Sequence, residues 1–183
     1  MKFKSLHKVL NNNNKVEIYY NNIVSLARNK NLYLKGGVPD TLDGRFELII
    51  LHCHFFIKRL LKIESDEKLF AQNIIDYMFK DFDRSLREIG VGDLSVGKKI
   101  KFMVASFYGR VNVYEEAFNR NKKIIHKVLK NNLYGTIAID DNKIIYMQKY
   151  IENLILFLNT CKDEEVLICF KSDINLFMDL SYE

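Results

Sequence analysis

Turn-forming residues are scarce in this chain. Its 183 residues include one proline and eight glycines. A β-sandwich or β-barrel needs a turn about every 8–12 residues, and such turns are mostly built with glycine or proline. The composition therefore argues against an all-β fold and directs attention to helices.

The chain also lacks the cysteine pattern of a disulfide framework. Its three cysteines, Cys53, Cys161 and Cys169, are odd in number and form no C-x-x-C pair. Cys53 and Cys169 lie in apolar runs, where a free cysteine behaves as a small hydrophobic residue. We therefore expect free thiols and a reducing compartment.

Long apolar runs are missing as well. The longest, such as 48–51 and 154–158, are far shorter than the ~20 residues that span a bilayer. Residues 1–10 contain three lysines but no apolar core of signal-peptide length. We expect a cytoplasmic protein that is soluble or at most peripheral on a membrane.

The charge balance is moderately basic. Lys and Arg total 28 against 23 Asp and Glu, which gives a net charge of +5. This excess is compatible with contact to anionic lipid, RNA or the ribosome, and equally with a solvated surface. A hydrophobic content of 48% excludes disorder as the general state, and the length predicts one domain.

Apolar residues recur at helical spacing along most of the chain. The sequence predicts an all-α fold, a single compact domain of six or seven helices. Residues 1–14, which end in four asparagines, are expected to form a flexible polar segment ahead of a helical domain of residues 15–183. In the tail from residue 163, a strand and a short helix are both compatible with the pattern, and we predict the helix. The other expected helices cover residues 15–33, 42–62, 66–89, 95–118, 121–133 and 141–159.

The helix at 42–62 is expected to be central because apolar residues surround most of it. Gly36, Gly37 and Pro39 end the helix before it, and Asp40 or Thr41 is its predicted N-cap.

Three further features concern the helices at 66–89 and 95–118. Ser65 is the predicted N-cap of the first of these helices, and Ser95 is the predicted start of the second. Ile89 is predicted to close a buried stripe that also contains Ile74, Ile75, Met78, Phe82 and Leu86. Gly109, inside the second of these helices, is predicted to let another helix approach closely.

Residues 92–99 come close to a phosphate-binding loop. Gly92, Gly97 and Lys98 match G-x-x-x-x-G-K-[ST], but Lys99 stands where the magnesium-binding hydroxyl residue is needed. The preceding segment has a helical pattern where a phosphate-binding loop follows a buried strand. We therefore interpret the segment as a turn between helices with solvated lysines.

His52 and His54 are the only pair of nearby histidines. Residues two apart on a helix point roughly 200° from each other, so the two rings do not share a metal ion without a third element. We expect one of them to be a core or interface residue. The residues indicate no metal ligand set and no catalytic group, so we expect no enzyme activity.

Polar side chains gather at the predicted helix starts and turns. Each has a local explanation as a cap or an i, i+4 ion pair, for instance Asp83 with Arg87. Together they are also the best candidate for a polar, basic docking face. For Tyr108 we predict core packing, with partner contact on the same candidate face as the alternative. The candidate partner-binding residues are Asp43, Arg45, Arg84, Arg87, Lys98, Lys99, Lys101, Tyr108 and Arg110.

Three long blocks carry a resemblance. They are GVPDTLDGRFELIILH (37–52), MFKDFDRSLREIGVGDLSVGKKIK (78–101) and FYGRVNVYEEAF (107–118). In this order they resemble the ubiquinol–cytochrome c chaperone family, whose bacterial members are related to a mitochondrial assembly factor for respiratory complex III. The resemblance covers roughly residues 15–133.

This resemblance implies a helical, non-enzymatic protein without a cofactor. It also implies a role in assembling cytochrome b, since the mitochondrial relatives bind newly made cytochrome b, pair with a small partner and associate with the ribosome. The implied partners here are cytochrome b, the ribosome and an anionic membrane surface at the inner face of the inner membrane, and not DNA. Whether a small partner subunit is kept stays open.

Two other classes of function remain alternatives from the residues. One is a helical ribosome- or RNA-binding module without a membrane client, although most Tyr and Phe residues fit buried stripes instead of a base-stacking surface. The other is an enzyme, which rests only on the near phosphate-binding loop and the histidine pair.

Overall fold

The computed structural model describes residues 2–63 and 67–168, with the side chains of residues 14–63 and 68–166. Within these ranges the chain forms helices and no strand, which confirms the predicted all-α domain. Six of these helices have nine residues or more, in agreement with the predicted number. The elements are α1 (Lys2–Ala27), α2 (Lys30–Leu34), α3 (Leu42–Leu60), α4 (Glu67–Glu88), α5 (Asp93–Glu115), a π-helical turn (Glu116–Arg120), a 3₁₀ turn (Lys122–Ile124), α6 (Ile125–Leu133), α7 (Asp141–Thr160) and α8 (Asp163–Ile168).

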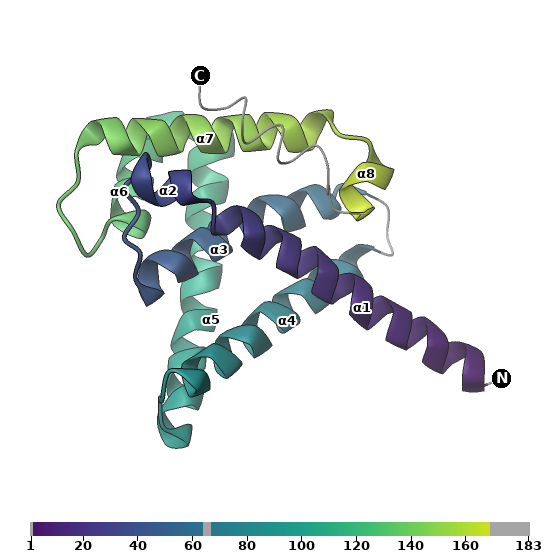
Figure 1. Ribbon diagram of the computed structural model, residues 1–183. Coiled ribbons are helices and arrows are strands. Elements are labelled where there is room, and N and C mark those ends of the chain that lie inside the picture. Colours follow the sequence, from purple (N-terminus) through teal and green to yellow (C-terminus); the bar gives the residue numbers. More distant parts are fainter. Residues whose placement is uncertain (1, 64–66, 169–183) are drawn as a thin grey trace.

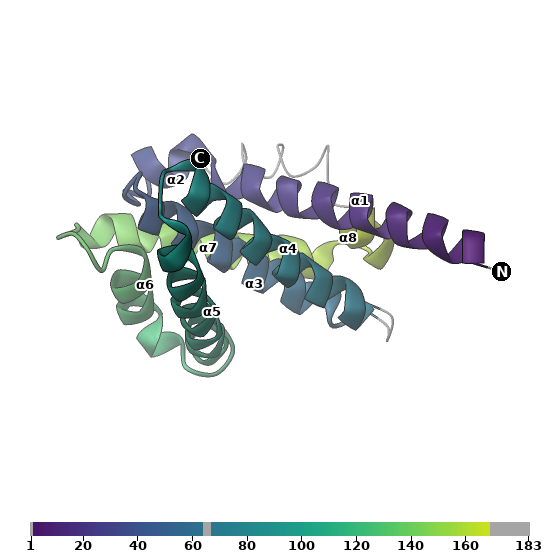
Figure 2. The ribbon, with the colours of Figure 1, turned by 90° about the horizontal axis from the view of Figure 1, so that it is seen from below.

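Helix α3 lies at the centre of the molecule (Figures 1 and 2). It packs against α1, α4, α5, α6, α7 and α8. Every side chain from Phe46 to Ile57 is buried. The central position predicted from the apolar character of this helix is confirmed.

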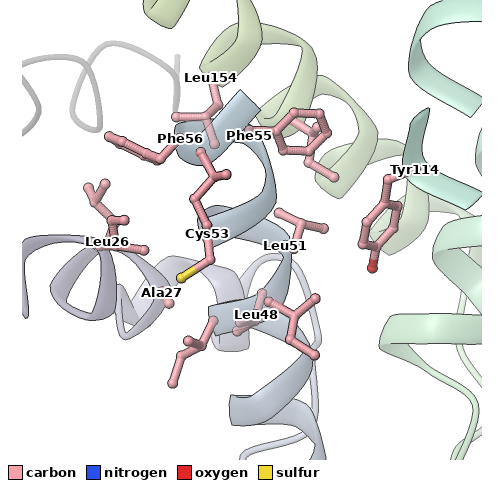
Figure 3. Close-up of a cluster of buried hydrophobic side chains, with 14 of the residues drawn as sticks. Leu26, Ala27, Leu48, Leu51, Cys53, Phe55, Phe56, Tyr114 and Leu154 are labelled. Atoms are coloured by element: carbon pink, nitrogen blue, oxygen red, sulfur yellow. The ribbon is translucent and has the colours of Figure 1, made fainter. Parts of the chain in front are cut away.

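Figure 3 shows how α3 contacts helices on several sides. Cys53 lies near Ala27 of α1, whereas Leu51 and Phe55 face Tyr114 of α5. The ring centroids of Phe55 and Tyr114 are 6.4 Å apart. A helix buried all round contributes much of its stability through such apolar contacts, each fully buried large side chain adding roughly 1.5–3 kcal/mol.

The remaining long helices form two hairpins around this core. Helices α4 and α5 pack together, as do α6 and α7. Helix α1 crosses both α3 and α4. The turn between α4 and α5 lies at the far end of the molecule from α7 (Figure 1).

The first helix differs from its prediction at both ends. Helix α1 begins at Lys2 instead of Lys15, and it stops at Ala27, after which Asn29 caps the separate helix α2 by accepting a hydrogen bond from the Asn31 amide at 2.8 Å. Each residue added to an existing helix forms one more backbone hydrogen bond. The free energy gained by this extension exceeds the cost of placing asparagine in a helix. The flexibility of residues 1–14 and the domain boundary there stay predictions.

The predicted ends of α3, α4 and α5 agree with the structure in one case and differ from it in two. Thr41 is the N-cap of α3, as predicted, because its hydroxyl accepts a hydrogen bond from the Gly44 amide at 3.2 Å. Ile89 is 61% exposed, so its predicted burial is wrong: α4 ends at Glu88 and Gly90, with φ of +88°, turns the chain away. Helix α5 begins at Asp93 after Gly92, so the predicted start at Ser95 is wrong.

Three further predictions concern Gly109, the tail from residue 163 and Ser65. The predicted role of Gly109 in close helix packing is wrong, because a Cβ added there would meet nothing within 4 Å. The short helix predicted after residue 163 is confirmed for α8. Ser65 and residues 169–183 lie outside the described residues.

Candidate functional site

A groove of about 500 Å³ opens where the start of α3, the side of α5 and the segment after α6 meet. Phe46 and Leu86 contribute apolar surface, and Leu42, Phe102 and Met103 add more. We call this feature the α3–α5 groove. A cleft of this size with mostly apolar walls and a few polar groups has the form of a ligand or peptide site.

The α3 wall of the groove is shaped by a tight chain reversal. A Cβ on Gly44 would lie 2.0 Å from the Pro39 carbonyl oxygen, so only glycine lets residues 36–41 close over the start of α3. Gly37, with φ of +69°, adopts the left-handed conformation that this reversal needs. The local sequence therefore determines the position of this wall.

The part of the groove formed by the end of α6 and the segment after it is tied to the same reversal. The Tyr134 hydroxyl donates a hydrogen bond to the Gly36 carbonyl at 2.6 Å. Lys143 Nζ donates to the Leu34 carbonyl at 3.1 Å. These contacts hold the end of α6 and the start of α7 beside α3, and so complete the groove.

A nearly buried ion pair lies at the base of the groove. Arg110 Nε lies 2.6 Å from Glu47 Oε1 and 2.5 Å from Oε2, and Glu47 is only 6% exposed. Burial raises the pKa of Glu47, and the hydrogen bond from Arg110 works against that rise. Removing Arg110 would leave the buried charge of Glu47 uncompensated.

The groove brings together four of the nine predicted partner-binding residues. Asp43, Lys98, Lys99 and Arg110 all line it. Asp43 is in the first turn of α3, where its charge favours the helix dipole. The docking role of these residues stays a prediction.

The other five predicted residues lie elsewhere. Arg45 pairs with Asp40 at 2.6 Å beside a different depression. Arg84 pairs with Asp81 at 2.5 Å, and Arg87 pairs with Asp83 at 2.6 Å, which confirms the predicted Asp83–Arg87 pair.

Lys101 and Tyr108 are on the exposed side of α5. Tyr108 is 51% exposed and packs its ring against Phe107 in a T-shaped arrangement, so the core packing predicted for it is wrong. The predicted single docking face is therefore divided between the groove, surface ion pairs and the outer side of α5.

Several groove residues were not predicted from the sequence. Phe102, which is 73% exposed, lies on a different side of α5 from the buried residues. A helical-wheel plot of the sequence would have shown this exposed position. Asn132 and Thr136 line the groove through the contact of α6 with α5, a long-range contact without a local signal.

The two histidines of α3 point to different helices. His52 is fully buried; its Nδ1 is 2.7 Å from the Leu48 carbonyl and its Nε2 is 2.6 Å from the Tyr150 hydroxyl. His54 Nε2 lies 3.3 Å from Glu115 Oε1. Burial lowers the pKa of both rings to about 4. Both are core residues, whereas the sequence predicted this for one of them.

The described part of the chain supports neither the near phosphate-binding loop nor a metal site, and it contains no membrane-spanning helix. Residues 93–99 form the first turns of α5 and follow α4, so no strand precedes the near phosphate-binding loop. Among the described residues, no group of three or more His, Cys, Asp or Glu side chains is placed to hold a metal ion. No helix in the described ranges is both long and apolar enough to cross a bilayer.

Comparison with known proteins assigns this fold to a family. Residues 34–168 match the family described as ubiquinol-cytochrome C chaperone. The ubiquinol-cytochrome c reductase complex assembly factor 1 of Mus musculus and that of Homo sapiens are each 20% identical over 149 residues, 81% of this chain and 50% of theirs. The chain thus spans about half the length of these curated relatives.

A solved structure agrees with this assignment. The crystal structure of the Cbp3 homolog from Brucella abortus is similar with a TM-score of 0.77 and 31% identity, over 92% of this chain and 93% of that one. The sequence match and the shared fold cover the same helices that build the α3–α5 groove. This chain belongs to the ubiquinol–cytochrome c chaperone family.

Proposed function

We propose that this chain is an assembly chaperone for the ubiquinol–cytochrome c reductase, respiratory complex III, and that it holds newly made cytochrome b. The matched relatives are named as assembly factors of that complex. The proposal also includes its location, the cytoplasmic side of the inner membrane, where a membrane-protein client becomes available. A chaperone of this kind acts by binding and not by catalysis.

The observation that carries the proposal is the α3–α5 groove. Its apolar walls, with Leu42 46% exposed and Phe102 73% exposed, offer surface to an apolar segment. Lys98 and Lys99 stand on the α5 side and Asp43 on the α3 side, so the groove also offers charged partners to polar groups next to such a segment. A transmembrane helix that has left the ribosome has this combination of apolar body and polar ends.

Capture of the client tests the proposal. Affinity-tagged chain should co-purify cytochrome b from detergent-solubilised membranes of translating cells. Ser106→Trp, which fills the groove, should reduce capture, because Ser106 is a groove residue. Asn112→Trp on the exposed side of the same helix is the matched control and should capture normally.

Loss of the chain gives a second measurement. A deletion strain should show a lower spectroscopic signal of assembled cytochrome b and lower reductase activity. Normal levels of both in the deletion strain would contradict the assembly role. Equal capture by the Ser106→Trp and Asn112→Trp variants would contradict the groove as the client site.

A ribosome- or RNA-binding module without a membrane client is the second candidate. The run from Leu94 to Tyr114 favours it, because it contains four basic residues and no acidic residue. Exposed aromatic surface on this run is limited to Phe102 and Tyr108, however, since Phe107 and Tyr114 are buried. Sedimentation with purified ribosomes, compared with capture of cytochrome b, separates the two candidates.

A further inference from the structure

The outer side of α5 combines exposed apolar and basic side chains. Helical spacing turns it away from the buried side that carries Val96, Phe107 and Tyr114. Leu94 is 93% exposed and Phe102 is 73% exposed, although both are large and apolar. We define the outer face of α5 by its exposed residues Leu94, Lys98, Lys101, Phe102, Tyr108 and Val113. Lys98 and Phe102 are at the edge of this face and also line the α3–α5 groove.

The charge on this face is uncompensated. No acidic residue occurs between Leu94 and Tyr114. Lys98 and Lys101 form no ion pair or hydrogen bond with the residues that the structure describes, in contrast to Arg110, which pairs with Glu47. The acids at the two ends of α5 are engaged, since Asp93 pairs with Arg87 and Glu115 pairs with Lys58.

Exposed apolar residues that lie singly on a surface are ordinary, but this face gathers four of them along one helix with unpaired lysines between them. Helices that lie in a membrane interface have this composition: apolar and aromatic side chains enter the boundary of the acyl chains while lysines contact anionic headgroups. A layer of headgroups satisfies lysines wherever they lie along the helix. A protein partner would need a carboxylate placed for each of them.

We infer that the outer face of α5 docks on an anionic lipid surface. The inference deepens the membrane location proposed above by naming the surface and the lipid chemistry that it binds. It relies on that location only for its setting in the cell, because lipid binding is measurable with the purified chain. The groove opens beside this face, so docking would hold a client segment close to the bilayer.

Vesicle flotation tests the inference. The full chain should float with phosphatidylcholine vesicles that contain phosphatidylglycerol, and much less with phosphatidylcholine alone. Binding should fall as salt rises from 0.1 M to 1 M, since the screening length falls from ~10 Å to ~3 Å.

A matched pair of double variants locates the surface. Leu94→Ser with Lys101→Gln should weaken the partition onto anionic vesicles by about fiftyfold, about fivefold from the lysine and about tenfold from the leucine. Leu156→Ser with Lys123→Gln makes the same chemical changes at exposed positions of α7 and the 3₁₀ turn, and should bind like the unmodified chain. Both variants change exposed residues, so equal melting temperatures confirm intact folds.

Tryptophan fluorescence gives an independent measurement, because the chain contains no tryptophan. Anionic vesicles should shift the emission of a Tyr108→Trp variant to shorter wavelength and leave that of a Leu156→Trp variant unchanged.

The inference is wrong if the full chain does not float with anionic vesicles at low salt. It is equally wrong if the two double variants bind alike, if vesicles without anionic lipid bind as well, or if Tyr108→Trp shows no shift. A salt-sensitive association with ribosomes but not vesicles would assign the face to RNA and also overturn it. No client is present in these assays, so a negative vesicle result would not contradict cytochrome b binding. In the same way, a negative capture experiment would not contradict lipid binding.

Discussion

Arg110 and Glu47 are 63 positions apart and meet at the base of the α3–α5 groove. The sequence predicted Arg110 as a basic docking residue, on the basis of its charge and its position in a helix. It could not show that Arg110 forms an ion pair within the protein, because Glu47 comes within reach of Arg110 only after α3 and α5 pack together. Residue type is a property of the sequence, whereas the partner of a charged group depends on the packing.

Replacing Arg110 should therefore affect stability strongly. Arg110→Met leaves the Glu47 carboxylate buried without its partner and should lower the free energy of unfolding by ~3–5 kcal/mol at neutral pH, measured by urea denaturation. The deficit should shrink as pH falls. Without Arg110 the pKa of Glu47 rises further above its unfolded value, and protonation removes the buried charge.

The control is Arg87→Met, at a 47% exposed position with surface acids as partners. This variant should unfold like the unmodified chain. Equal stabilities of the Arg110→Met and Arg87→Met variants would contradict a structural role for the buried pair.

Glycines show which features of single elements were predictable. The sequence predicted that Gly36, Gly37 and Pro39 end a helix, because these preferences are local, and α2 does end at Leu34. It also predicted a packing role for Gly109, which is wrong, because a glycine inside a helix does not reveal whether another helix passes it. The glycine that does have a close neighbour is Gly44, at the start of α3.

Two alanine substitutions should therefore act in opposite directions. Gly44→Ala places a methyl group against the Pro39 carbonyl oxygen and should lower the free energy of unfolding by ~1–3 kcal/mol. Gly109→Ala fills open space in an exposed helix and should raise it by ~0.5–1 kcal/mol. Thermal or urea denaturation of the two variants beside the unmodified chain measures both. A destabilised Gly109→Ala variant would mean that the space beside this helix is occupied.

Buried titratable groups make the stability of the whole molecule depend on pH. Burial lowers the pKa of His52 to about 4, against an ordinary value of 6.5. A histidine whose pKa is lower in the folded state stabilises the protein above its unfolded pKa, and this stabilisation is lost as pH falls from about 6.5 toward 4. His54 acts in the same direction, and Glu47, whose pKa is raised, acts in the opposite one.

We therefore expect the free energy of unfolding to fall as the pH is lowered from 7 to about 4, by ~3 kcal/mol from the fully buried His52 alone. His52→Gln should flatten this dependence in urea denaturation measured across that range. His126→Gln, at a half-buried position whose side chain is 41% exposed, is the control and should keep it. A stability that stays constant or rises between pH 7 and pH 4.5 in the unmodified chain would show that the two histidines are not buried in their neutral form.

The sequence by itself determined the helical class, the central place of α3 and the family. These depend on local periodicity, on the scarcity of turn residues and on three ordered blocks, all of which are written along the chain. Only the tertiary structure decided which predicted docking residues share the groove, which are used in ion pairs and which lie on the outer face of α5. The physical reason is that Lys98 and Arg87 look alike along the chain, and their different surroundings arise only when distant helices meet.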